Sequence, residues 1–199
     1  MPSPISLASL RKIPLAYASC SIGTHPSDTL PRKLEAISNA GFTAIELSFP
    51  DLVAYAKSTV NELIDEENYP ELSKAAKDIA RICKSLNLEI MMLQPFSNFE
   101  GWPKGSSERE EAFTRARGWI QLMRACGTDL LQVGSTDSDE QKITHNRDDI
   151  IQDLRELADM LAKENFRMAY ENWYLTLDFV SILFKLPAAN GVTLRQSQV

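Results

Sequence analysis

Four apolar runs of this sequence each contain one side chain that forms hydrogen bonds. Glu46 lies in AIELSFP, Gln94 in MMLQPF, Gln132 in LLQVGS and Glu171 in AYENW, each in the later half of its run. Burying such a group without a partner costs roughly 2 to 7 kcal/mol. Any one of them alone would more often be exposed or ion-paired than functional. Four in equivalent places favour one shared polar site, and we predict that they converge there on a ligand.

The segments that must position these side chains repeat one pattern: an amphipathic helix, then Gly or Asn, then a short apolar run. Apolar residues recur at helical spacing over 30–37, 72–86, 112–126 and 150–161. Gly or Asn after each helix supplies the left-handed residue that ends it. The repeat predicts parallel strands covered by helices, in either a doubly wound sheet or a (β/α) barrel.

Two polar stretches follow the second and third predicted strands. Residues 53–70 are expected to form a loop. A loop that covers the site and a solvated connector without a role in binding are equally compatible with its sequence. Residues 97–110 are expected to form a second loop, in which SNFEGWP folds over the mouth of the site and Trp102 supplies apolar cover. Both stretches lie on the carboxyl side of strands, where barrels carry their substrate loops.

The composition limits the class of protein. The 199 residues carry a formal net charge of -6 and 44% hydrophobic residues, which suits one globular domain. The acidity argues against nucleic acid as a partner. Three separate cysteines suggest neither a disulfide framework nor a thiolate metal site. The first residues lack the apolar core of a signal peptide, and no run is long enough to span a membrane. We expect a cytoplasmic protein with no membrane partner.

Longer stretches of the sequence carry a family resemblance. They are YASCSIGTHPSDTLPRKLEAISNAGFTAIELSFPD, LEIMMLQPFSNFEGWPKGSSEREEAFTRARGWI, GTDLLQVGSTDSD and FRMAYENW. These resemble the fungal 3-dehydroshikimate dehydratase-like proteins of the xylose isomerase-like TIM barrel superfamily, which includes sugar phosphate isomerases and epimerases. The resemblance implies a (β/α) barrel that holds a divalent metal (Mg, Mn or Co) at the carboxyl ends of its strands.

The resemblance also implies roles for individual residues. By position, Glu171 matches the first metal-binding glutamate. Glu46 matches a glutamate near the substrate, and Gln94 lies in the LQPF segment that lines the same pocket. With Gln132 and Trp102, these two residues form the expected substrate-binding set. The expected substrate is a small polyol or cyclic hydroxy acid.

The implied reaction is the metal-dependent conversion of 3-dehydroshikimate to protocatechuate, as in quinate and shikimate catabolism. It needs a base to remove a proton beside a carbonyl and an acid to assist loss of hydroxide. The base is unassigned, because a family histidine expected just after Glu171 is replaced by residues 174–177. His145 is expected in solvent, whereas His25 follows the first strand on the active side and is equally compatible with a role there.

The family pattern fades after Trp173. A typical barrel needs roughly 250 residues, so we expect an incomplete barrel of about five βα units and a vestigial sixth strand, over residues 13–199 after an extension at 1–12. Weak metal binding and impaired activity are then expected. Two alternatives stay open: a sugar phosphate isomerase or epimerase, and a non-catalytic partial barrel. The endonuclease IV branch is disfavoured by the acidity and by the lack of histidine ligands.

Overall fold

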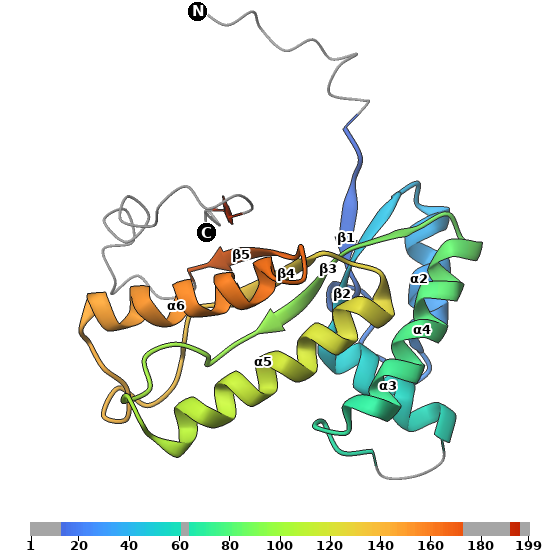
Figure 1. Cartoon of the computed structure of the whole chain (residues 1–199). Helices are drawn as coiled ribbons and strands as arrows, with labels where there is room; N and C mark the ends of the chain where they lie inside the picture. Colours follow the sequence, from blue (N-terminus) through green and yellow to red (C-terminus); the bar gives the residue numbers. More distant parts are fainter. Residues whose placement is uncertain (1–12, 61–63, 173–191, 196–199) are drawn as a thin grey trace, which may run out of the picture.

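The computed structural model describes residues 13–60, 64–172 and 192–195, and shows alternating strands and helices (Figure 1). The predicted extension at 1–12 and the segment 173–191 lie outside the described residues. In chain order the elements are β1 (Ala16–Ala18), the short 3-10 helix η1 (Ser19–Ser21), α2 (Leu30–Asn39), β2 (Ala44–Ser48), α3 (Phe49–Val60), α4 (Tyr69–Ser85), β3 (Glu89–Phe96), α5 (Ser107–Cys126), β4 (Leu130–Gly134), α6 (Arg147–Ala162), β5 (Arg167–Glu171) and β6 (Val192–Arg195).

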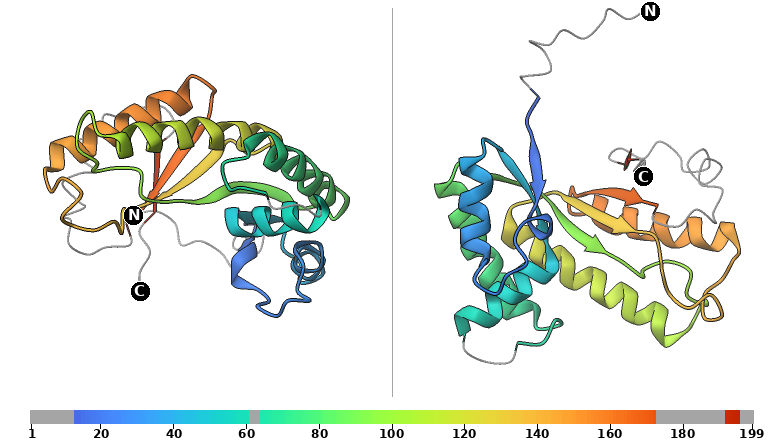
Figure 2. Two further views of the ribbon diagram at one scale, coloured as in Figure 1. Left: turned by 90° about the horizontal axis from the view of Figure 1, so that it is seen from below. Right: turned by 180° about the vertical axis from the view of Figure 1, so that it is seen from behind.

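The strands form one parallel sheet in the order β1-β2-β3-β4-β5-β6. The helices lie along one side of this curved sheet, as the view from below in Figure 2 shows. A doubly wound sheet reverses its strand order and carries helices on both faces, whereas strictly sequential order with helices on one side is the arrangement of a (β/α) barrel. The structure therefore confirms an incomplete barrel with a sixth strand.

The helix ends use the residues that the sequence indicates. Gly41, Asn87, Gly127 and Asn165, which follow α2, α4, α5 and α6, all have positive φ, the conformation that ends a helix and redirects the chain. At the opposite ends, side chains accept hydrogen bonds from the first-turn backbone, which satisfies otherwise unpaired N–H groups. These N-caps are Asn68 for α4, Ser106 for α5 and Asn146 for α6.

One predicted loop is largely helical. Residues 53–60 belong to α3, and α4 begins at Tyr69, so the expectation of a loop over 53–70 is wrong for most of its length. The apolar face of α3 is short: Leu52, Val53 and Ala56 are buried, while polar residues dominate the turns that follow. The second predicted loop is also shorter than expected, because α5 starts at Ser107.

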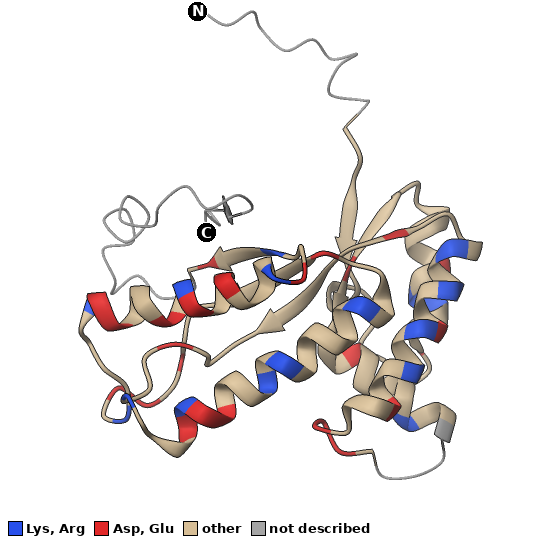
Figure 3. Cartoon of the chain, viewed as in Figure 1, with Lys and Arg blue, Asp and Glu red and all other residues tan. Residues whose placement is uncertain are grey.

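The core lies between the sheet and the helices, and a much smaller apolar cluster occupies the other face of the sheet. Met92, Leu130 and Ala169 form that second cluster. Charged residues of both signs lie mainly on the helices and loops (Figure 3). Among the described residues, no helix is long and apolar enough to cross a membrane.

Gly118 in α5 provides a test of how closely α4 and α5 pack. A Cβ at this position would lie 2.2 Å from the ring of Tyr69. Gly to Ala in an open helix stabilises by about 0.5–1 kcal/mol, but here we expect Gly118→Ala to destabilise by about 1–3 kcal/mol because the ring must move. Thermal unfolding checks the sign. The exposed Gln121→Ala on the same helix is the control, and a higher Tm for Gly118→Ala would contradict the packing described.

Candidate active site

The strand register places the four predicted polar residues on one face of the sheet. Along β2 and β3, Glu46 pairs with Met92 and Ser48 with Gln94; between β4 and β5, Gly134 pairs with Glu171. Neighbouring residues in a strand point to opposite faces. The immediate neighbours of the four residues belong to the core beneath the helices, namely Ile45, Leu47, Leu93, Leu131, Val133 and Tyr170. The four polar side chains therefore share the opposite, inner face.

Gln132 and Glu171 are in direct contact on this face. Gln132 Nε2 donates a hydrogen bond to Glu171 Oε2 over 2.5 Å. Gln132 is only 7% exposed, and its Oε1 is buried without a hydrogen-bond partner. The structure thus brings together the residue predicted to bind metal and one predicted to bind substrate.

Gln94 makes a different contact. Its Nε2 donates a hydrogen bond to Cys20 Sγ over 3.4 Å, which joins β3 to the short helix η1 that follows β1. Glu46 is half-buried on β2 and pairs in the register with Ala18 on β1. These residues therefore occupy the β1–β3 side of the inner face, and the Gln132–Glu171 pair occupies the β4–β5 side.

Trp102 lies in the segment after β3 and packs against the helix-side core. Its indole Nε1 donates a hydrogen bond to the carbonyl oxygen of Asn98 over 3.1 Å. The ring is half-buried by these contacts. Its expected contact with substrate stays a prediction.

Glu100, in the same segment, was not singled out from the sequence. Its side chain is fully buried. Glu100 Oε1 accepts hydrogen bonds from the backbone N–H of Thr136 and from the hydroxyl of Tyr170, both over 2.8 Å, while Oε2 is buried without a partner. The only sequence signal is its place in FEGWP, between an aromatic residue and Gly101, whose φ is 93°.

Burial controls the ionisation of this group. Desolvation raises the pKa of Glu100, outweighing the opposing effect of its hydrogen bonds from Thr136 and Tyr170. Burial likewise raises the pKa of the Tyr170 hydroxyl, and the nearby Glu100 raises it further. Since Tyr170 belongs to the core beneath the helices, Glu100 anchors loops on that side and is not part of the inner face.

Two more contacts fix the loops around Glu100. Asn98 Oδ1 accepts hydrogen bonds from Thr136 Oγ1, the Asp137 backbone N–H and Ser138 Oγ. The buried carboxylate of Asp153 accepts the backbone N–H of Gly101 over 3.0 Å and is also paired with Arg109. The loops that follow β3 and β4 are therefore bound to each other and to α6.

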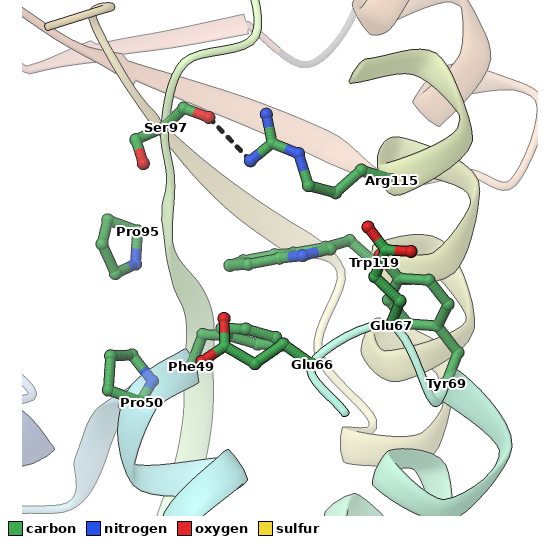
Figure 4. Close-up of a pocket in the computed structure, with 9 residues that line it drawn as sticks. All are labelled: Phe49, Pro50, Glu66, Glu67, Tyr69, Pro95, Ser97, Arg115 and Trp119. Carbon is green, nitrogen blue, oxygen red and sulfur yellow. Dashed lines mark hydrogen bonds between the residues drawn. The ribbon is translucent and has the colours of Figure 1, made fainter. Parts of the chain in front are cut away.

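A pocket of about 270 Å³ opens at the carboxyl ends of β2 and β3 (Figure 4). Trp119 from α5 stacks on Phe49 with ring centroids 4.6 Å apart. Arg115 donates hydrogen bonds to the carbonyl oxygens of Ser97 and Asn98, and burial lowers its pKa. Trp119 and Phe49 belong to the helix-side core. The pocket is therefore close to the inner face but is not lined by the four polar residues. Its full lining is Phe49, Pro50, Glu66, Glu67, Tyr69, Pro95, Ser97, Arg115 and Trp119.

Comparison with known proteins agrees with this geometry. A family model described as "Xylose isomerase-like TIM barrel" matches residues 34–182, which is most of the chain. The chain belongs to this family. The match spans β2 to β5 and therefore covers all four polar residues of the inner face.

Within the xylose isomerase-like family, the chain is similar to proteins named 3-dehydroshikimate dehydratase. One, from Neurospora crassa, is 32% identical over 171 residues, which cover 82% of this chain and 47% of the relative. Another, from Pseudomonas aeruginosa, is 34% identical over 145 residues, 73% of this chain and 20% of the relative. This chain thus spans less than half of either relative.

A solved structure with a xylose isomerase-like TIM barrel is also similar to this chain. A xylose isomerase-like TIM barrel/4-hydroxyphenylpyruvate dioxygenase fusion protein is 29% identical, with a TM-score of 0.63 over 79% of this chain and 21% of that one.

The divalent metal implied by the resemblance stays a prediction, and Glu171 is the one ligand predicted for it. Glu171 offers a half-buried carboxylate on the inner face, an oxygen donor of the type that Mg²⁺ and Mn²⁺ prefer. Among the described residues, no group of three or more His, Cys, Asp or Glu could hold a metal ion. His25 and His145 are both exposed and hydrogen-bonded locally, to Ser27 and to the carbonyl of Glu140.

Glu100 makes the stability of the fold depend on pH. The pKa of this carboxyl is higher in the folded chain than in the unfolded chain, so the folded chain holds the proton more tightly. Its contribution to the free energy of unfolding is therefore greatest below the ordinary glutamate pKa of 4.5 and declines as pH rises toward the pKa of the folded chain. Glutamine resembles the protonated acid and does not titrate. We therefore expect the Tm difference between Glu100→Gln and the parent to shift in favour of the variant as pH rises through that window.

Thermal unfolding at a series of pH values checks this expectation. The matched control is Glu111→Gln, which makes the same substitution at an exposed position of α5. A difference that moves against Glu100→Gln with rising pH would show that the buried carboxylate is stabilised as an anion.

Proposed function

We propose that the inner face of this sheet is the substrate site of a metal-dependent lyase that converts 3-dehydroshikimate to protocatechuate. The observation that carries the proposal is the hydrogen bond between Gln132, in the middle of β4, and Glu171, at the carboxyl end of β5. Enzymes with barrels of this kind place their active sites at that end. Similarity to dehydratases at 32% and 34% identity supports the choice of reaction.

The reaction removes a proton beside the ketone and expels one ring hydroxyl as water; a second ring proton then moves to the ketone oxygen, which makes the ring aromatic. A divalent cation (Mg, Mn or Co) held by Glu171 would supply positive charge for the enolate oxygen. Gln132 holds the Glu171 carboxylate in one orientation through its amide hydrogen bond, as outer groups do for metal ligands. Glu46 and Gln94 present hydrogen-bonding groups from the other side of the same face.

The same reasoning sets the expected level of activity. A hard cation needs about six ligands and more than one anchoring carboxylate, and Glu171 is the one such residue we assign in the described part of the chain. We therefore propose weak metal binding and low turnover for this chain by itself. The substrate class is a small cyclic hydroxy acid or polyol.

Protocatechuate formation from 3-dehydroshikimate tests the proposal. We expect the purified chain to produce it slowly with Mn²⁺, and Glu171→Gln to abolish it because the neutral amide holds the cation poorly. The matched control is Glu89→Gln, an exposed glutamate at the opposite, amino end of β3. No product at any Mn²⁺ concentration, or equal rates for the chain and Glu171→Gln, would overturn the proposal.

A further inference from the structure

Only one of the two polar groups of the Gln132 side-chain amide has a hydrogen-bond partner. Its NH₂ group donates to Glu171 Oε2, while Oε1 is buried and has no hydrogen-bond partner. Leaving a buried acceptor unpaired is costly, and native proteins rarely keep one without a reason. Turning the amide around would not help, because Oε1 would then face the Glu171 carboxylate, acceptor against acceptor.

The surroundings of Oε1 on the inner face are small and apolar. The residue paired with Gln132 on β5 is Ala169, whose side chain is a single methyl group. Ala169 packs with Met92 and Leu130, and Leu130 lies two residues before Gln132 on the same face of β4. The amide of Gln132 is therefore next to an apolar cluster on one side and to Glu171, in the proposed substrate site, on the other.

We propose that Gln132 is a specificity-determining residue whose Oε1 accepts a hydrogen bond from a ring hydroxyl of the substrate, while its NH₂ group holds Glu171. This inference rests on the proposed function and deepens it. An amide oxygen only accepts hydrogen bonds, so this point of the site selects a hydroxyl. It disfavours a carboxylate, a phosphate or a ketone oxygen, none of which donates. One side chain would then align the hydroxyl with the metal-binding carboxylate.

A series of product-like acids tests the inference without needing turnover. The probes are 3,4-dihydroxybenzoate, 3-hydroxybenzoate, 4-hydroxybenzoate and benzoate, titrated into the intact chain with diamagnetic Mg²⁺ and followed by ligand-observed NMR. One hydrogen bond is worth about 0.5–1.5 kcal/mol, so we expect removal of the recognised hydroxyl to weaken binding roughly two- to tenfold. If the parent chain binds all four acids equally, the inference is wrong, and this result requires no variant to fold.

Variants then assign the preference to Gln132. Gln132→Met and Gln132→Leu lack the acceptor and should bind the hydroxylated and unhydroxylated acids with equal affinity. The control Gln121→Met, at an exposed position of α5, should keep the parent's preference. A preference that survives in both Gln132 variants overturns the inference but leaves the proposed function standing. Failure of the parent to bind any of the acids overturns the proposed function itself, and the inference with it.

Discussion

The buried carboxylate of Glu100 connects the loops that follow β3 and β4 to strand β5. It lies in the segment after β3, accepts the N–H of Thr136 from the loop after β4, and accepts the hydroxyl of Tyr170 from β5. Burying a carboxyl without a cation beside it is costly, and its raised pKa is the sign of that cost. The hydrogen bond from Tyr170 to Glu100 fixes the orientation of β5. Because Tyr170 is held on the helix side, the next residue, Glu171, lies on the inner face.

Much of this arrangement could be predicted from the sequence, because it depends on periodicity. The stripes over 72–86, 112–126 and 150–161 predicted α4, α5 and α6, and the glycine and asparagine caps predicted where the strands begin. Helix α3 was missed because its buried face is only Leu52, Val53 and Ala56, too short to stand out among polar neighbours. Glu100 was missed because its burial depends on partners 36 and 70 residues away.

The pairs within the polar site could not be predicted, because they depend on register. The β2–β3 ladder shifts between Ile45 and Glu46, and the β3–β4 ladder between Leu93 and Phe96. A shift of one residue moves a side chain to the other face of a sheet. The sequence therefore indicated that Glu46, Gln94, Gln132 and Glu171 belong together, but not that Gln94 contacts Cys20. The Gln132–Glu171 contact lies on the β4–β5 ladder, which has no shift, and depends on which residues of these two strands pair.

Two of the buried oxygen atoms that lack partners in the described part of the chain lie on opposite sides of the sheet, and their chemistry differs. Glu100 Oε2 lies on the helix side and Gln132 Oε1 on the inner face. A carboxylate can relieve its burial by taking up a proton, which is what a raised pKa describes. An amide oxygen has no such route at ordinary pH, so only a donor brought to it can satisfy Gln132. The unpaired oxygen on the helix side is thus compatible with a purely structural role, whereas the one on the inner face would be satisfied by the ligand hydroxyl proposed above.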